Sequence, residues 1–348
     1  MFIIMSFVLT FVFILAFKKV ALKVGLVDKP GGRKKHDAPV PLIGGVAIFS
    51  AFMLLCLVFT PWWDHWMSYM ALSILLYVGV IDDAIEVNAK FKFAVHFLVA
   101  TMLVVDGTVL TSMGHIFGNT ETSFGWFAPV FTVCCIVYLI NAINMIDGVD
   151  GLSGGIGLVT VLFMFFATFT HSFEAVTELR FLLGALLAFL VFNVRHPWRK
   201  SASVFMGDAG TMSLGFVLAW LSIGFSQGPT AAFEPIVVAW LLALPIWDAF
   251  GMLTARVRLG QHPFEPDRRH FHHHFLEAGF SPSVTTLLIL MYCVVLCSIG
   301  VFLPKYGVPT WGLTGAWIVM WGVHTQLSYK PEGFIRLLKS ARKMRQKS

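Results

Sequence analysis

The chain has 348 residues, of which 57% are hydrophobic and only 13% are charged, and its formal net charge is +6. A soluble globular domain carries about a quarter charged residues, so the composition excludes an ordinary soluble protein. The apolar runs are continuous and roughly 15 to 22 residues long, unlike the alternating strands of a membrane barrel, and they predict an all-α integral membrane protein.

The apolar runs predict about eleven transmembrane helices, with the amino terminus outside and the carboxyl terminus in the cytoplasm. In this topology every lysine and arginine except Arg180 and Lys305 lies on the cytoplasmic side. The net positive charge therefore faces anionic lipid headgroups, and the sequence indicates no nucleic-acid partner. The predicted spans are 2–17, 42–60, 66–81, 91–105, 126–143, 152–170, 179–194, 210–226, 235–254, 284–303 and 309–327.

The first polar cluster lies at the inner end of the third span, where Asp82 and Asp83 are adjacent and Glu86 follows. Adjacent carboxylates repel each other, and near a membrane a divalent cation or a shared proton relieves that repulsion. Lys90 and Lys92 follow within two turns and could pair with the acids or bind a phosphate. The alternative is a solvated helix end without a ligand.

The second cluster is the stretch NAINMIDGVDG, residues 141–151, at the end of the fifth span. Asn141 and Asn144 are three residues apart and would share one face of a helix. The glycines that follow break the helix and let the backbone approach a ligand closely. Together with Asp147 and Asp150, these amides fit a diphosphate-sized ligand and a metal. A polar loop would explain the Asp-Gly pairs, but not amides one turn earlier inside an apolar run.

The third cluster is VFMGDAG, residues 204–210, just before the eighth span. Asp208 lies where a helix N-cap is expected, and its carboxylate could equally bind a hard cation at the membrane surface. Asn193 and Arg195 lie upstream and add hydrogen-bond donors to the same surface.

The fourth cluster is the longest cytoplasmic loop, RVRLGQHPFEPDRRHFHHHF, residues 256–275. Zinc is a rival ligand for clustered histidines, but neighbouring arginines would oppose a dication. Histidine together with arginine matches phosphate oxygens better. The candidate residues are Arg256, Arg268, Arg269, His270, His272, His273 and His274.

A buried acid and the end of the chain complete the survey. Asp248 follows Pro245 in the ninth span and is either a core residue paired with a neighbour or a partner of the metal site. We expect residues 1–329 to form one polytopic domain and residues 330–348 to form a basic cytoplasmic tail, either frayed or folded as an amphipathic helix on the inner leaflet.

The four clusters together supply acids for Mg²⁺, basic groups for phosphates and a membrane that could hold a lipid. This combination favours the transfer of a phosphoryl-linked group onto a lipid at the inner membrane surface. An ion-coupled transporter is the alternative from another class, since acids inside membranes often mark ion pathways. The acids here gather at one surface instead of the midplane, and the sequence has no visible inverted repeat, so we favour the enzyme.

These motifs resemble the polyprenyl-phosphate N-acetylhexosamine-1-phosphate transferases, and the likeness covers most of the chain. The shared motifs are the acid pair at Asp82, the NxxNxxDGxDGL stretch, FMGDAG and the HxHH signature at His270. The spacing of PDRRHFHHHFLEAGFS is most similar to the members that act on UDP-N-acetylglucosamine and undecaprenyl phosphate. The related enzymes of peptidoglycan synthesis carry a different histidine motif in this loop.

The resemblance implies transfer of N-acetylglucosamine 1-phosphate from UDP-GlcNAc to undecaprenyl phosphate with Mg²⁺ or Mn²⁺ as cofactor, releasing UMP. This would be the first membrane step of a surface polysaccharide such as O-antigen or common antigen. It further implies a bacterial inner membrane protein with a cytoplasmic active site, and a homodimer is one assembly to test. UDP-GalNAc and UDP-MurNAc-pentapeptide are the alternative donors.

The resemblance also implies roles for individual residues. Asp82 and Asp83 would serve the lipid phosphate and the metal, and Asp208 would bind Mg²⁺. Glu86 stands where the family often has Asp, which leaves its role open, as it is for Asn193, Asp248 and His274. The nucleotide sugar would contact Asn141, Asn144, Asp147, Asp150, His270, His272 and His273. The phosphates would contact Lys90, Arg256, Arg268 and Arg269.

The reaction that the resemblance implies favours a single step. A lipid phosphate has its second pKa at about 6, so in the cytoplasm it is mostly dianionic and already nucleophilic. We therefore favour one in-line attack on the β-phosphorus, with Asp82 positioning the lipid phosphate or removing a residual proton. A two-step route through an aspartyl-phosphate stays open.

Overall fold

The computed structural model describes the chain from residue 1 to residue 345 apart from six short gaps, and the regular structure in these residues is almost entirely helical. The exception is a two-stranded antiparallel sheet in which β1 (Val27–Asp28) pairs with β2 (Val40–Pro41). The described residues are 1–28, 39–118, 120–168, 176–196, 198–228, 231–262 and 269–345.

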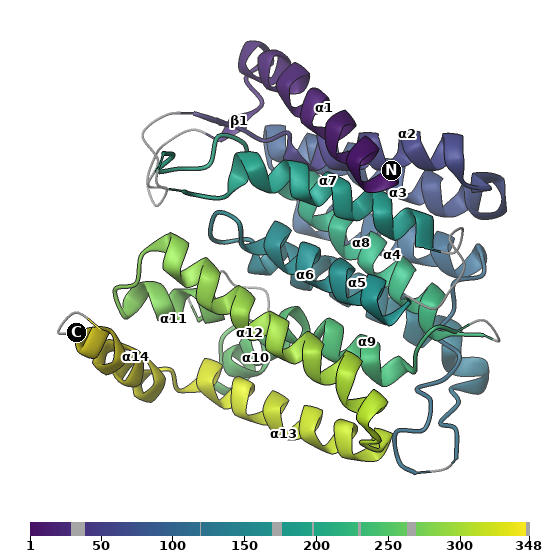
Figure 1. Cartoon of the computed structure of the whole chain (residues 1–348), viewed down its shortest axis with the longest axis vertical. Helices are drawn as coiled ribbons and strands as arrows, with labels where there is room; N and C mark the ends of the chain where they lie inside the picture. Colours follow the sequence, from purple (N-terminus) through teal and green to yellow (C-terminus); the bar gives the residue numbers. More distant parts are fainter. Residues whose placement is uncertain are drawn as a thin grey trace.

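Each of the eleven predicted apolar ranges is helical over most of its length, and two further α-helices, α11 and α14, lie outside these ranges (Figure 1). The helices are α1 (Phe2–Val24), α2 (Gly44–Phe59), α3 (Trp66–Ile85), α4 (Ala89–Val105), α5 (Ala128–Ile146), α6 (Leu152–Ala167), α7 (Thr177–Asn193), α8 (Gly207–Ser226), α9 (Pro235–Leu241), α10 (Ala243–Arg258), α11 (Phe271–Glu277), α12 (Pro282–Phe302), α13 (Thr310–Tyr329) and α14 (Glu332–Arg345).

Fewer helices than eleven are both long and apolar enough to cross a membrane. Among the described residues five segments meet that condition, and the bent pair α9 and α10 makes a sixth if it is one span. The all-helical membrane fold is therefore supported, while the number of eleven spans and the topology stay predictions. The five segments are Phe2–Val24, Trp62–Ile85, Gly125–Ile146, Gly207–Ser226 and Pro282–Tyr306.

The ninth predicted span, 235–254, is helical on both sides of a break and is not one continuous helix. The chain breaks at Leu242, where α9 ends and α10 begins at an angle of 70°. Pro245 lies in the first turn of α10, where its missing N–H leaves no helical hydrogen bond unmade. The break turns α10 toward the histidine cluster and brings Asp248 to the start of α11.

Helix α8 occupies the centre of the bundle, and α1 lies at its edge (Figure 1). In the apolar window of α8, 89% of the residues are buried by other helices, against 17% in α1. A helix that is apolar on all sides and buried belongs to the core, whereas the exposed side of α1 is suited to lipid. The first turn of α8 carries Asp208, so this acid lies at the end of the central helix.

Glycines allow α2 and α3 to approach the first turn of α8 closely. A Cβ atom added to Gly45 would lie 2.0 Å from the Cα of Gly210, and one added to Gly79 would lie 2.2 Å from the Cα of Ala209. Both obstacles are backbone atoms, which cannot swing aside as a flexible side chain would. These contacts fix the ends of three helices relative to one another before any polar group interacts.

The carboxyl-terminal residues form α14, which packs on α11 at the same end of the bundle as β1 (Figure 1). The ring of Phe334 lies 5.8 Å from the ring of Phe271, nearly parallel to it, and 5.9 Å from that of Phe275. Ile335 is buried as well. The apolar side of this amphipathic helix therefore covers the helix that carries the histidines.

We expect Gly210→Ala to destabilise the protein, because the new methyl group would lie 2.6 Å from the Cα of Gly45. Gly224→Ala is the matched control on the same helix, since nothing lies within 4 Å of its added Cβ. Thermal unfolding in detergent should show a loss of about 1–3 kcal/mol for the first variant and no loss for the second. Equal midpoints for the two variants would contradict the close approach.

Candidate active site

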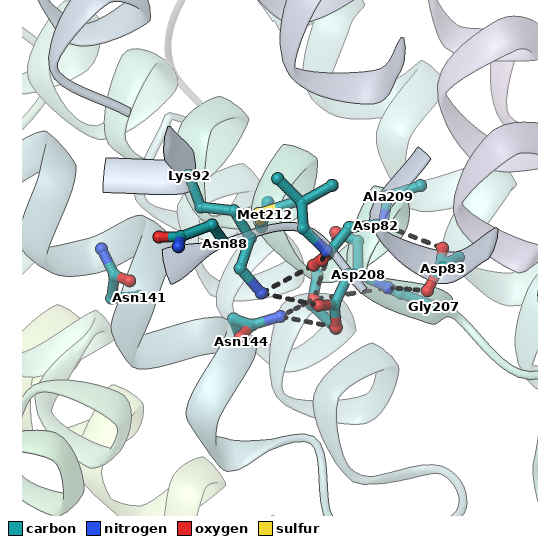
Figure 2. A network of polar contacts seen from close by, with 12 residues as sticks. Asp82, Asp83, Asn88, Lys92, Asn141, Asn144, Gly207, Asp208, Ala209 and Met212 are labelled. Carbon is teal, nitrogen blue, oxygen red and sulfur yellow. Dashed lines mark hydrogen bonds and ion pairs between the residues drawn. The ribbon is translucent and has the colours of Figure 1, made fainter. Parts of the chain in front are cut away.

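Acids, amides and a lysine from four helices meet at the first turn of α8 (Figure 2). Asp82 and Asp83 end α3, Lys92 lies on α4, Asn144 on α5 and Asp208 on α8. The sequence predicted that the first three clusters would come together, and the described contacts join Asp83 and Asn144 directly to the first turn of α8.

Asp83 caps the amino terminus of α8. Its Oδ1 accepts a hydrogen bond from the backbone N–H of Asp208 at 2.8 Å, and its Oδ2 accepts one from that of Ala209 at 3.2 Å. Gly207 precedes them with φ of 73°, and a Cβ there would lie 2.5 Å from Asp83 Oδ2. Only glycine fits this backbone conformation without strain. The expectation that Asp208 is the N-cap of its own helix is wrong, because the capping side chain, Asp83, comes from α3.

Asp82 is held by a lysine and a turn. Lys92 Nζ lies 2.7 Å from Asp82 Oδ2 and 3.5 Å from Asp208 Oδ2, so one ammonium group bridges two carboxylates. The backbone N–H of Val87 donates to Asp82 Oδ1 at 2.7 Å. This bond is made possible by Glu86, which ends α3 with a positive φ of 53° and has an exposed side chain.

The two amides of α5 have different partners. Asn144 Nδ2 donates to Asp208 Oδ1 at 3.0 Å and to Thr211 Oγ1 at 2.8 Å, which orients the acid from the side. Asn141 Nδ2 lies 3.2 Å from His96 Nδ1 and donates to the carbonyl of Val137. Asn144 therefore belongs to the acid cluster, whereas Asn141 lies one turn deeper.

The loop after α5 is tied to the loop before α8. Asp150 Oδ2 accepts from Arg195 Nε at 2.7 Å and from the backbone N–H of Ala202 at 3.0 Å. Asn193 Oδ1 accepts from the backbone N–H of Gly151 at 2.6 Å, while its Nδ2 donates to the carbonyl of Val204. Asp150 and Asn193 thus organise the two loops against each other.

Asp147 lies at the end of α5, in the same loop and close to the histidine cluster. Its Oδ1 accepts a hydrogen bond from Ser153 Oγ at 2.7 Å. The next residue, Gly148, lies against His272, because a Cβ at Gly148 would be 2.2 Å from His272 Nε2. This contact joins the second cluster to the fourth, so that all four clusters of the sequence form one continuous polar region.

The histidines lie at the start of α11, a helix within the segment that was predicted to be a loop. The rings of His270 and His272 are 5.7 Å apart and nearly parallel, and those of His272 and His273 are 4.2 Å apart. His274 points to the other side, where its ring contacts that of Phe334. The rings of His270, His272 and His273 therefore lie together, with the first two buried, and the fourth histidine belongs to the packing between α11 and α14.

The buried histidines resist protonation. Burial lowers the pKa of His272 to about 3, with a further lowering by the neighbouring His273. Burial likewise lowers the pKa of His274 to about 4. Both rings are therefore neutral at neutral pH and contribute through packing instead of charge.

The arginines predicted to bind phosphates are spread around α11. Arg256 is buried on the last turn of α10, and Arg269 precedes α11. Arg269 also lines a cavity of about 410 Å³ between α11 and α14, together with Arg336 and Lys339. Arg268 lies outside the described residues.

Three residues of the site were missed or given little weight in the sequence. Lys92, and not Lys90, makes the described ion pairs with the acids, while the side chain of Lys90 is exposed. His96 and His324 are buried in apolar helices, where a single histidine carries no spacing signal. Residues two apart point to different sides of a helix, so helical periodicity was the only sequence signal that could have favoured Lys92 over Lys90.

The acid cluster fits a magnesium ion only in company with substrate phosphates. Magnesium prefers oxygen ligands, keeps several waters and uses one or two carboxylates together with phosphate oxygens. Asp208 has 39% of its side chain accessible and Asp82 has 5%, so Asp208 is the more open acid. In the part of the chain that the structure describes, no three His, Cys, Asp or Glu side chains could hold an ion by themselves.

An apolar helical bundle of this kind, with acids, amides and histidines gathered in one polar region, is typical of a multi-pass membrane protein with a functional site. The sequence profile of glycosyl transferase family 4 matches residues 65–226. The chain belongs to this family, which confirms the resemblance seen in the motifs.

Relatives extend the match over nearly the whole chain. The undecaprenyl-phosphate alpha-N-acetylglucosaminyl 1-phosphate transferase of Salmonella typhi is 32% identical over 96% of this chain and 92% of its own length. The protein with the same name from Yersinia pestis is 32% identical over 98% of this chain and 95% of its own length. The one from Haemophilus influenzae is 29% identical over 88% of both chains.

We expect Lys92→Ala to reduce turnover by about a hundredfold or more, because it leaves two close carboxylates without their shared cation. Lys90→Ala removes the same charge from the same helix and should cost much less. Steady-state rates of the two variants decide which lysine serves the site. A greater loss in Lys90→Ala would favour the prediction made from the sequence.

His272→Gln should make stability less sensitive to acid. The ordinary histidine pKa of 6.5 is lowered in the folded protein to about 3, so between these values the unfolded chain binds a proton that the folded chain does not. The stabilisation is present above about pH 6.5 and is lost as the pH falls, at about 1.4 kcal/mol per pH unit. Unfolding midpoints at about pH 7.5 and about pH 5.5 should differ more in the wild type than in the variant. Equal differences would contradict the burial of a neutral ring.

Proposed function

We propose that this protein transfers N-acetylglucosamine 1-phosphate from UDP-GlcNAc to undecaprenyl phosphate and releases UMP. The observation that carries the proposal is the acid cluster at the end of the central helix, where Lys92 bridges Asp82 and Asp208 and Asp83 caps the helix. Relatives that span nearly the whole chain are named as transferases of this kind, which supports the same donor and acceptor.

In this proposal Asp208 and Asp82 would hold Mg²⁺ or Mn²⁺ together with phosphate oxygens of the substrates. When bound, such an ion neutralises charge that develops on the transferred phosphoryl group. We give Asp83 a different role in our proposal, because both of its oxygens accept hydrogen bonds from the first turn of α8. Asp83 acts by fixing the first turn of α8, on which Asp208 is carried.

The residues of the chain bring the two phosphates together and hold them in line. Lys92 offers a cation to a phosphate oxygen beside Asp82, which suits the lipid phosphate. Asn144 keeps Asp208 oriented, and His270, His272 and His273 present ring nitrogens where the diphosphate of the donor would lie. Because the lipid phosphate is already nucleophilic, positioning and charge neutralisation are the main contributions of the protein.

We further propose that the eleven apolar ranges all span the bacterial inner membrane, with the amino terminus outside and the active site facing the cytoplasm. Almost all lysines and arginines fall on the side of the acid cluster in this topology, which the positive-inside rule favours. The surface glycan that the product serves, O-antigen or common antigen, and assembly as a homodimer remain predictions.

Purified protein, undecaprenyl phosphate and UDP-GlcNAc, with and without Mg²⁺, test the reaction. The expected result is metal-dependent release of UMP with formation of the lipid-linked sugar. Competing UDP-GalNAc and UDP-MurNAc-pentapeptide in the same assay tests the donor, and a different preferred donor would revise it. No release of UMP from any donor would end the enzyme proposal and revive the ion-coupled transporter.

Asp208→Asn should abolish turnover while leaving a folded protein. The amide keeps the size of the side chain and can still accept a hydrogen bond from Asn144, but it loses the charge that a metal requires. The measurement is UMP release, with thermal unfolding as the control for folding. Substantial activity in a folded variant would remove Asp208 from the metal site.

A further inference from the structure

Asp248 is a buried carboxylate that the proposed reaction does not use directly. It lies on α10 just after the break between α9 and α10, and it is 1% exposed. Its Oδ2 accepts a hydrogen bond from His270 Nδ1 at 2.8 Å, and its Oδ1 accepts one from the backbone N–H of Phe271 at 2.8 Å. The expectation that Asp248 pairs with a neighbour is confirmed, and the neighbour is the first histidine of the motif.

These two hydrogen bonds have different consequences. The N–H of Phe271 at the start of α11 has no partner within its own helix, so its bond to Asp248 fixes this end of the helix. The bond to His270 fixes the ring, because an imidazole whose Nδ1–H is donated to a carboxylate has one orientation and one tautomer. The opposite ring nitrogen, Nε2, necessarily points away from Asp248.

The surroundings leave Asp248 as the anionic partner of this ring. His324 from α13 places Nε2 3.9 Å from Asp248 Oδ1 and has no hydrogen-bond partner for that nitrogen. The rings nearest to His270 on α11 are those of His272 and His273, which are not anionic. Because Nδ1 is engaged by Asp248, Nε2 is the ring nitrogen that is left to meet a ligand.

We propose that Asp248 is a positioning residue that holds His270 so that its Nε2 faces the diphosphate of the nucleotide sugar. This inference rests on the proposed function for the identity of the ligand. In this inference Asp248 acts on the nucleotide-sugar part of the site, through the histidines of α11. Its role differs from that of the acids that serve the lipid phosphate and the metal.

Asp248→Asn distinguishes positioning from simple support of α11. The amide oxygen can still accept the N–H of Phe271, so the helix cap is kept. The amide nitrogen would face His270 Nδ1 and donate to it, which removes the charge from the pair and reverses the hydrogen bond. We expect KM for UDP-GlcNAc to rise about tenfold, with KM for undecaprenyl phosphate within about twofold of the wild type.

Asp106→Asn is the matched control. Asp106 is also a buried carboxylate that accepts a backbone N–H in the first turn of a helix, from Ser68 of α3 at 3.0 Å, with His65 nearby at 3.9 Å. Asp106 follows α4 and contacts the start of α3, whereas Asp82 lies near the other end of α3. Asp106→Asn should leave both KM values unchanged, and a selective rise in donor KM in this variant would overturn the inference.

A double mutant tests whether Asp248 acts through His270. His270→Gln alone should raise donor KM, and adding Asp248→Asn to it should cost about twofold or less. Losses that multiply, or a wild-type donor KM in folded Asp248→Asn, would overturn the inference.

If Asp248→Asn does not fold, Asp248→Glu is the second variant, because it keeps the charge. It should bind the donor better than His270→Gln, and equal losses in the two variants would again overturn the inference. A wild type without turnover would instead reject the proposed function.

Discussion

The carboxylate of Asp83 holds the first turn of a helix that belongs to another part of the chain. Two hydrogen bonds from the start of α8 end on this one side chain of α3. A carboxylate at a helix amino terminus stabilises it by about 0.5–2 kcal/mol, through the unpaired N–H groups and the helix dipole. The value to the site is geometric, since the same turn carries Asp208 and presents it to Lys92 and Asn144.

The contact between Asp83 and the start of α8 depends on glycines, which have no side chain to hold the helices apart. Gly45, Gly79 and Gly207 let three backbones come closer than any other residue would allow, and only then can Asp83 reach the start of α8. The central position of α8 adds to the constraint, because a helix buried on all sides cannot shift without moving its neighbours. The geometry of the polar groups is thus set by the apolar packing of the helices that carry them.

Much of this arrangement could be predicted from the chain, and the remainder depends on contacts between distant segments. Apolar run lengths predicted the helices, and charged motifs predicted that Asp82, Asp208 and Asn144 would share one end of the bundle. No local pattern could show that Asp83 caps α8 or that the ninth range breaks at Leu242. Asp248 likewise acquires its partner only when the break turns α10 toward α11.

The packing of α14 on α11 has a consequence for the order of events during synthesis. Phe271, His274 and Phe275 contact Phe334, which leaves the ribosome only after every other element of the site has been made. Until then the histidine helix lacks its cover on one side, even with the acids already in place in the membrane. The packing around the histidine helix is therefore complete only after α14 has been made.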